Sequence, residues 1–261
     1  TLERDMPRQH RPDLQRFLDR LTSRSILTDE EQQAVLDLPG HAEQVHANRD
    51  FVPLGERVDH ATLIVAGMVG RFDQNGEGSR QITAIHLPGD MCDLHSVVQP
   101  VPTSALQALS TSTILRVSHR SIRTAAARFP ALAEALWRDC MVDAAILSEW
   151  VVNVGNRDAR KRIAHFLCEM ACRLKVRPQG NYVVLDLYIS QQQLAEATAM
   201  TPVHVNRTLQ GMRADGLVDW RTRIVRLPDW ERLCEAGEFD PTYLQADIQP
   251  AQRMRIMEAA A

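Results

Sequence analysis

The sequence has no apolar run approaching the roughly 18 residues that a membrane-spanning helix needs. No apolar stretch follows a basic one near the N-terminus, as it would in a secretory signal. The five cysteines are odd in number and scattered, unlike the framework of a disulfide-rich secreted domain. We therefore expect a cytoplasmic protein that does not enter a membrane.

Sequence motifs of common enzyme classes are also missing. There is no Gly-rich phosphate loop, no nucleophile elbow and no spaced set of His and carboxylate residues. We therefore expect a protein that is not an enzyme. The alternative is an enzyme built on a β-barrel, with Cys92, Asp93 and His95 as nucleophile or metal ligands.

Charge is unevenly distributed along the 261 residues, although the net charge is only −3. Residues 157–232 contain 13 Lys and Arg against 8 Asp and Glu, whereas residues 1–156 contain 15 against 20. A basic segment behind an acidic one favours a polyanionic partner for the basic segment alone. The alternative is a chance fluctuation on a solvated surface.

The N-terminal half predicts two helices followed by short strands. Residues 13–21 carry apolar side chains at helical spacing, and Thr28 with Glu31 forms a capping box for a second helix. Asn75-Gly76 is a hairpin signal between β-rich runs. The pattern indicates a small barrel or sandwich, whose strands would come from 61–72, 80–87, 104–110 and 113–118.

Residues 130–155 contain no Pro after the first position and no Gly before the last, and they predict a helix of about 25 residues, roughly 37 Å long. Apolar residues recur on it at the spacing of a coiled-coil seam: Cys140, Ala144, Leu147, Val151 and Val154. We expect a dimer helix that ends in a hinge at Gly155-Asn156. A single buried core helix is the alternative. On the next helix, Cys168 and Cys172 are expected to be buried thiols rather than metal ligands.

Residues 190–216 predict two short helices joined by a tight turn. Ser190 and Gln193 form a capping box for the first. Thr201 is an N-cap for the second, and Pro202 stands at N1, where its missing N–H is harmless. Gly216 suits the left-handed position after the helix. The second helix would bury Val205, Leu209 and Met212 and would fit a DNA major groove as part of a helix-turn-helix.

Residues 217–227 then predict two strands around Arg221 and Thr222, a small wing whose cations, including Arg223 and Arg226, would meet phosphates. With this wing, the segment resembles the Crp/Fnr family of bacterial transcription regulators. The family pattern runs without gaps from Ile189-Ser190 through Leu194, Val205, Arg207 and Leu209 to Leu217-Val218, and the wider resemblance covers roughly 28–233.

The resemblance implies an α+β fold with an N-terminal antiparallel β-roll (a double-stranded β-helix, cyclic-nucleotide-binding-like), a long dimerisation helix and a C-terminal winged helix-turn-helix. The expected domains are 1–129 (N-terminal helices and effector-sensing β-roll), 130–156 (dimerisation helix and hinge), 157–235 (DNA binding) and a 236–261 tail. It also implies double-stranded DNA with a palindromic site, a second copy of the chain and RNA polymerase as partners.

By the same resemblance, four residues would face base edges: Pro202, Val203, Asn206 and Arg207. Val203 stands where many members carry Glu. Arg can pair with guanine and Asn with adenine. The full expected DNA-binding set is Ser190, Gln191, Thr201, Pro202, Val203, His204, Asn206, Arg207, Arg221, Thr222 and Arg223. Base contacts are assigned to Pro202, Val203, Asn206 and Arg207.

The effector of the β-roll is not identified by the resemblance. Where cAMP-binding members carry Arg and Glu, this chain has Thr103 and Leu94, so cyclic nucleotide binding is not expected. Iron–sulfur binding is not expected either, because no cysteine precedes Cys92. A haem ligated through His86, His95 or Cys92, or a redox thiol at Cys92, remains an alternative. An unknown small molecule would contact Gly89, Asp90, Cys92, Asp93, Leu94, Thr103, Ser104 and Ala105.

Overall fold

The computed structural model describes residues 10–74, 76 and 78–246. They gather into two compact units, one containing 10–69, 86–144 and 245–246 and the other 70–85 and 145–244. Helices combine with antiparallel sheets, which confirms the predicted α+β class. No helix within the described ranges is both long and apolar enough to cross a membrane.

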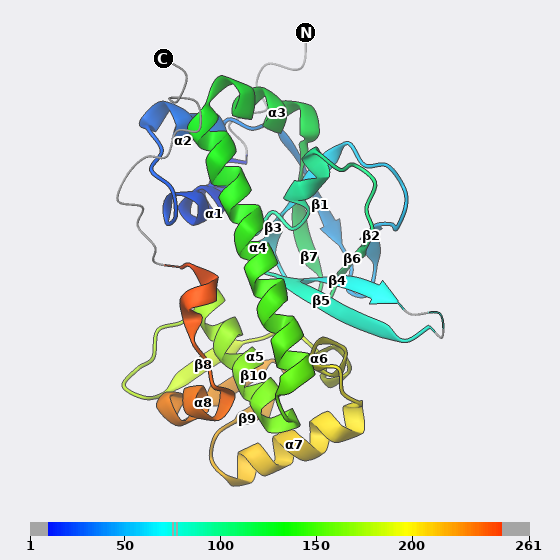
Figure 1. Cartoon of the computed structure of the whole chain (residues 1–261), viewed down its shortest axis with the longest axis vertical. Helices are drawn as coiled ribbons and strands as arrows, with labels where there is room; N and C mark the ends of the chain where they lie inside the picture. The colour runs from blue at the N-terminus through cyan, green and yellow to red at the C-terminus, as the bar shows by residue number, and fades with distance from the viewer. Residues whose placement is uncertain (1–9, 75, 77, 247–261) are drawn as a thin grey trace. The chain divides into compact units, whose positions relative to one another are not determined.

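The first unit contains an antiparallel sheet of order β1-β7-β3, and it also contains the antiparallel neighbours β2 and β6. Figure 1 shows these strands with helices α1, α2 and α3. Their bounds are α1 (Arg11–Thr22), α2 (Asp29–Leu36), β1 (Gly40–Val45), β2 (Asp50–Val52), β3 (His60–Ala66), β6 (Ala105–Ala108), β7 (Ser112–Ser118) and α3 (His119–Arg128), with a 3-10 turn η1 (Leu94–Val97).

The two N-terminal helices form as predicted. α1 buries Leu14, Phe17, Leu18 and Leu21, the stripe expected from the spacing. The Thr28 hydroxyl accepts the N–H of Glu31 at the start of α2, and the Glu31 carboxylate accepts the N–H of Thr28 at 2.8 Å. Both contacts depend on residues three apart, so the sequence alone determines them.

The β-rich run 61–72 contributes to two strands, β3 and β4 (Val69–Gln74). Gly67 separates them with a φ of +89°. A Cβ at Gly67 would lie 2.3 Å from Ser112 Oγ and 2.7 Å from Ser112 Cα, so the turn needs both the left-handed backbone and the missing side chain. The residue after β4 in the predicted hairpin, Asn75, lies outside the described residues.

Apolar side chains fill the interior of the β-roll. Ile64 and Ile114 are fully buried there, together with Leu106 at 2% exposure. Burial of this kind stabilises the fold by about 25 cal/mol for each Å² of apolar surface removed from water. The cluster consists of Val45, Val52, Val58, Ile64, Val69, Cys92, Leu106, Ala108 and Ile114.

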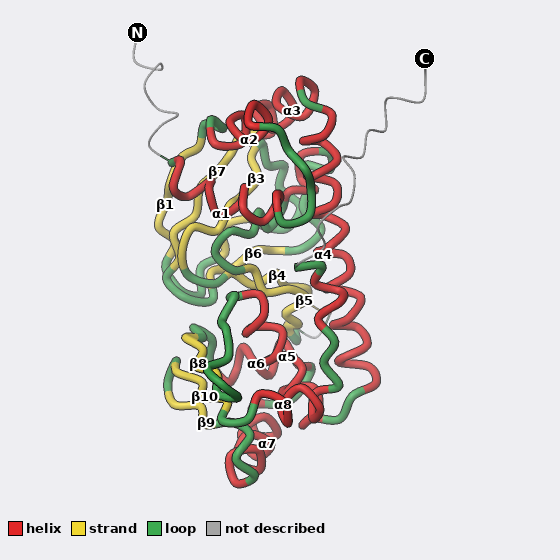
Figure 2. The backbone as a smooth tube through the Cα atoms, turned by 90° about the vertical axis from the view of Figure 1, so that its left-hand side faces the viewer, coloured by secondary structure: helices red, strands yellow, loops and turns green. Residues whose placement is uncertain are grey.

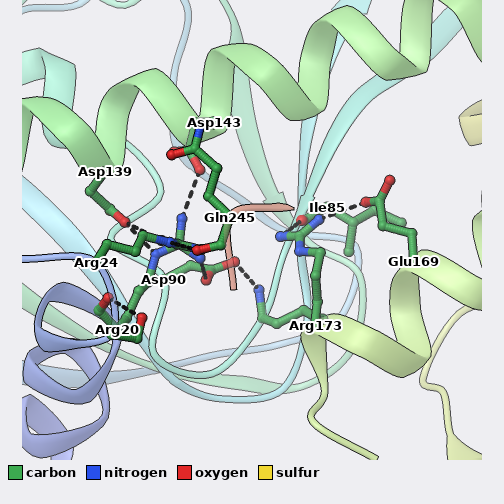
Figure 3. A network of polar contacts seen from close by, with 11 residues as sticks. Arg20, Arg24, Ile85, Asp90, Asp139, Asp143, Glu169, Arg173 and Gln245 are labelled. Atoms are coloured by element: carbon green, nitrogen blue, oxygen red, sulfur yellow. Dashed lines mark hydrogen bonds and ion pairs between the residues drawn. The ribbon is translucent and has the colours of Figure 1, made fainter. Parts of the chain in front are cut away.

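A buried ion network joins α1 to the first half of α4 (Pro130–Asn156) in this unit, as Figure 3 shows. Arg20 donates to Asp139 at 2.5 Å, to Asp90 at 2.6 Å and to Asp143 at 2.9 Å. Arg24 also reaches Asp139, at 3.1 Å. Because Asp139 is only 2% exposed, each of these charges needs the others to offset its desolvation.

Helix α4 matches the long helix predicted over 130–155, and it includes Gly155-Asn156, where the sequence predicted a hinge. One face is buried against the protein's own core, including Leu132, Val142 and Ile146. The opposite face leaves large apolar side chains exposed. They are Trp137, Met141, Leu147, Val151 and Val152.

The second unit contains an antiparallel sheet of order β8-β10-β9 together with helices α5 to α8 and the last part of α4 (Figure 2). Its remaining strands β4 and β5 (Arg80–His86) are hydrogen-bonded neighbours. The other bounds are α5 (Ala159–Arg173), β8 (Val183–Asp186), α6 (Gln191–Thr198), α7 (Pro202–Ala214), β9 (Asp219–Arg221), β10 (Ile224–Leu227), α8 (Trp230–Gly237) and a 3-10 turn η2 (Pro241–Leu244).

Residues 236–244, expected to be part of a tail, begin inside α8 and continue with contacts to α5. The Tyr243 hydroxyl donates to Glu169 Oε2 at 2.8 Å, and Trp150 Nε1 donates to the same oxygen at 2.8 Å. Arg173 bonds the other Glu169 oxygen at 3.0 Å (Figure 3). Residues 70–85 group with this unit, whereas the sequence assigned them to the β-roll. The domain boundaries stay a prediction.

Candidate nucleic-acid interface

Helix α6 begins at the predicted capping box. The Ser190 hydroxyl accepts the N–H of Gln193 at 3.1 Å, and the Gln193 side chain accepts the N–H of Ser190 at 2.7 Å. α6 ends at Thr198, and the next residue, Ala199, has a left-handed φ of 52° that turns the chain toward α7. The Arg162 guanidinium of α5 donates to the Thr198 carbonyl at 3.2 Å and fixes this turn.

Helix α7 starts and stops where the sequence predicted. The Thr201 hydroxyl accepts the N–H of His204 at 3.2 Å, and Pro202 is the first helical residue. Gly216 has a φ of +70°, and the Leu217 N–H donates back to the Met212 carbonyl at 2.9 Å. That bond satisfies one of the last helical carbonyls, which have no partner inside the helix. The predicted set Val205, Leu209 and Met212 is buried and anchors α7.

The outward face of α7 carries the residues expected to read bases. Pro202, Val203, Asn206 and Arg207 are all exposed, and Val203 is 79% exposed. The Arg207 guanidinium has no hydrogen bond or ion pair with any residue that the structure describes. An exposed, unpaired guanidinium retains all five donors for a ligand.

Asn206 is held in place from both sides. Its Nδ2 donates to Gln191 Oε1 of α6 at 3.1 Å, and its Oδ1 accepts from Gln210 Nε2 at 2.9 Å. An amide has two donor hydrogens and two acceptor lone pairs, so one of each stays available. Gln191, which is itself in the expected DNA-binding set, therefore also orients the Asn206 amide. No sequence pattern indicated this contact, because it spans 15 positions.

The wing forms between β9 and β10. Thr222 stands at its tip with a φ of 55°, an uncommon conformation for a β-branched residue. Arg221 lies 3.3 Å from Asp219 and Arg223 3.4 Å from Asp186, with side chains 76% and 56% exposed. Ion pairs this exposed are worth about 0–1 kcal/mol, so a phosphate can compete for either arginine.

The expected effector residues contact other parts of the protein. Asp93 accepts the Thr62 N–H at 2.5 Å, and the Cys92 thiol donates to the Thr62 carbonyl at 3.3 Å. Asp90 bonds Arg20 and the Leu87 N–H. Of the others, Leu94 is buried, Gly89 has a φ of +99°, Thr103 is exposed, and Ser104 and Ala105 are half-buried. The set holds two carboxylates and no cation, so it does not fit a cyclic phosphate.

The haem-ligand and enzyme candidates are spread between core and surface. Cys92 is 1% exposed and His86 is 3% exposed, whereas His95 is exposed. In the part of the chain that the structure describes, no three His, Cys, Asp or Glu residues gather as metal ligands.

The expected dimer seam divides between the two faces of α4. Leu147 and Val151 are exposed at 46% and 62%, and Ala144 is exposed beside them. Cys140 packs against the core of the first unit, and Val154 is half-buried. The sequence missed Trp137 and Met141, which are 60% and 64% exposed.

Comparisons with known proteins agree with this geometry. Residues 161–236 match the Crp-like helix-turn-helix domain. The transcriptional activator protein FnrL of Cereibacter sphaeroides is 24% identical over 219 residues, covering 81% of this chain and 86% of that protein. The nitrogen fixation regulation protein FixK of Azorhizobium caulinodans is 26% identical over 160 residues, covering 61% and 64%.

The solved structure of FixK2 from Bradyrhizobium japonicum has the same fold, with a TM-score of 0.70 at 24% identity over 76% of this chain and 98% of that one. Residues 161–236 therefore match a Crp-like helix-turn-helix domain, and the chain is similar in sequence and in fold to regulators of the Crp/Fnr type.

Proposed function

We propose that the chain regulates transcription by binding a palindromic DNA site as a homodimer, without enzymatic activity. The observation that carries the proposal is the outward face of α7, where Asn206 and Arg207 are exposed side by side. A helix anchored by three buried residues on its other face suits insertion into the major groove. Two such helices in a dimer would read half-sites about 34–36 Å apart.

Each exposed residue suits a different base. The Arg207 guanidinium can donate to O6 and N7 of one guanine. The free donor and acceptor of Asn206 suit N7 and N6 of adenine, with Gln191 and Gln210 holding the amide in orientation. Val203 has no acceptor for cytosine but can pack on a thymine methyl.

Contacts to phosphates would fix the register of the protein on DNA. Ser190, Gln191, Thr201 and His204 line the N-terminal ends of α6 and α7, where helix N–H groups attract anions. Arg221, Thr222 and Arg223 would reach the neighbouring backbone from the wing. Binding should therefore weaken as salt rises, because these contacts release counterions.

The DNA proposal is tested by the substitution Arg207→Ala. A DNA site is first selected from random oligonucleotides, and affinity is then measured by fluorescence anisotropy. Loss of a bidentate Arg–guanine pair costs about 1–3 kcal/mol, so specific affinity should fall by about 5- to 150-fold while weak, salt-sensitive binding remains.

Arg232→Ala in α8 is the matched control, since it removes the same charge from the same unit at a side chain 57% exposed. It should bind the selected site like the unsubstituted protein. Equal affinities of the Arg207 and Arg232 variants would refute the docking of α7.

The dimer interface is proposed on the exposed apolar face of α4. Trp137, Met141, Ala144, Leu147 and Val151 recur on it at steps of three and four residues, the spacing of a coiled-coil seam. An exposed apolar stripe of this kind marks an interaction surface. This face keeps three of the residues expected from the sequence and replaces Cys140 and Val154 by Trp137 and Met141.

Met141→Lys tests the interface by sedimentation velocity. A charge in the middle of the seam should convert dimer to monomer, because a buried unpaired ammonium is strongly unfavourable. Val98→Lys is the control, at an apolar side chain 80% exposed elsewhere on the first unit. A dimer that survives Met141→Lys would place the interface on another surface.

An effector in the β-roll and RNA polymerase as a partner complete the proposal. The relatives are named as transcriptional activators or regulators, which supports contact with the polymerase. DNA selection with and without cell extract tests the effector, since a ligand that shifts the protein toward its DNA-binding form must raise site affinity.

A further inference from the structure

Two cysteines from different helices lie against each other in the second unit. Cys168 of α5 and Cys234 of α8 have their sulfur atoms 3.8 Å apart, and both are free thiols. Cys168 is fully buried, whereas Cys234 is half-buried. Cys172 stands one helical turn after Cys168 and is half-buried as well.

The packing of α8 on α5 fixes this distance. Gly237 of α8 lies so close to α5 that a Cβ on it would be 2.6 Å from the His165 backbone nitrogen. The His165 ring also bonds the Gly237 carbonyl at 3.2 Å, and Leu233 between the helices is fully buried. A disulfide has a sulfur–sulfur bond of about 2.05 Å, so the two sulfurs need to approach by about 1.8 Å. Side-chain rotation can supply a movement of that size.

The two thiols differ in chemistry. A hydrogen bond from Cys168 lowers the pKa of Cys234, and burial raises the pKa of Cys168. The thiolate is the nucleophile in thiol oxidation. Cys234, which is also the more accessible of the two, is therefore the group that an oxidant in solvent meets first.

We propose that Cys168 and Cys234 form a redox pair that closes to an intrachain disulfide on reaction with a hydroperoxide. This inference does not depend on DNA binding. The Cys234 thiolate attacks one peroxide oxygen, so that a sulfur–oxygen bond forms and the oxygen–oxygen bond breaks. The Cys168 sulfur then attacks the Cys234 sulfur, which forms the disulfide and releases hydroxide. The two thiol protons end up in the products, and with hydrogen peroxide two thiols give one disulfide and two waters.

The bridge joins residues 66 positions apart and encloses α6, α7 and the wing. A crosslink of this span restricts the unfolded chain, so oxidation should raise the thermal midpoint of the second unit. This readout separates a formed bridge from simple oxidation of a thiol, which adds a polar group without closing a loop.

The test oxidises the reduced full chain with hydrogen peroxide and maps its peptides by mass spectrometry without reduction. The expected product is a linked pair of peptides containing Cys168 and Cys234, two hydrogens lighter than the reduced pair, with a higher thermal midpoint. Dithiothreitol should reverse both changes.

Variants assign the roles. Cys172→Ser, one turn away on the same helix, should keep the bridge and the rise in midpoint. In Cys168→Ala, oxidation should stop at a sulfenic acid on Cys234, which dimedone traps. The thermal midpoint of this variant should not rise. A bridge of Cys172 to either partner, an intermolecular bridge, or an unbridged Cys168–Cys234 pair in the unsubstituted protein would each overturn the proposal. Because the peptide map of the unsubstituted protein is decisive, a variant that fails to fold does not weaken the test.

Discussion

Gly237 is the last residue of α8, and its substitution by alanine should destabilise the second unit. A Cβ there would lie 2.6 Å from the His165 nitrogen and 3.0 Å from the Ala164 carbonyl carbon, both backbone atoms of a buried helix. Carbon atoms normally approach to about 3.5–4.0 Å, so α8 would have to move away by about 1 Å. The movement would also lengthen the hydrogen bond between the His165 ring and the Gly237 carbonyl.

Two opposing effects set the size of the stability change caused by Gly237→Ala. Overpacking costs about 1–3 kcal/mol, and the strained hydrogen bond adds about 1 kcal/mol. Replacing a helical glycine by alanine stabilises the folded state by about 0.5–1 kcal/mol. We expect Gly237→Ala to lower the free energy of unfolding by roughly 1–3 kcal/mol.

Gly211→Ala is the matched control, because a Cβ at this helical glycine of α7 meets no atom within 4 Å. It should raise the free energy of unfolding by about 0.5–1 kcal/mol. Urea denaturation followed by tryptophan fluorescence measures both variants, with equal m values as the check that the denatured state is unchanged. If Gly237→Ala were as stable as the unsubstituted protein, or both variants moved in the same direction, the close approach of α8 to α5 would be wrong.

Three further substitutions probe other parts of the chain by the same denaturation assay. Asp139→Ala should cost about 3 kcal/mol, because it leaves Arg20 and Arg24 buried with fewer counter-charges; a loss below about 1 kcal/mol would contradict a buried network. Thr222→Gly should stabilise the wing by about 0.5–1 kcal/mol by relieving its left-handed conformation, and no gain would count against that geometry. Burial lowers the pKa of His165. As the pH falls below about 6.5, His165 therefore takes up a proton in the unfolded chain before it does so in the folded one. The free energy of unfolding should decline in that pH range. His165→Gln should reduce this slope, and an unchanged slope would assign it to other groups.

The sequence predicted the candidate site well where its structure depends on near neighbours. The caps at Ser190 and Thr201 and the left-handed Gly216 each involve residues within three or four positions, and all three were confirmed. The anchoring face of α7 follows from helical periodicity in the same way. Helix α3 was not predicted; Ile122 is its one buried apolar residue.

For the long helix α4, periodicity predicts the helix but not which of its faces the core covers. Both faces of α4 are rich in apolar residues, and the pattern does not say which of them the protein's own core covers. In the structure Cys140 packs on the core, whereas Trp137 and Met141 remain exposed. Similarly, the run 61–72 has the composition of one strand, but a close approach of Ser112 requires a turn at Gly67.

Contacts between distant positions were decided by the tertiary structure alone. Gln191 reaches Asn206 because α6 and α7 cross there, and Cys168 meets Cys234 because α8 packs on α5. The sequence by itself determined where α6 and α7 begin and end and which face α7 buries, since local hydrogen bonds and hydrophobic spacing specify both. It could not determine which side chains meet across them, because that depends on how the buried faces pack in three dimensions.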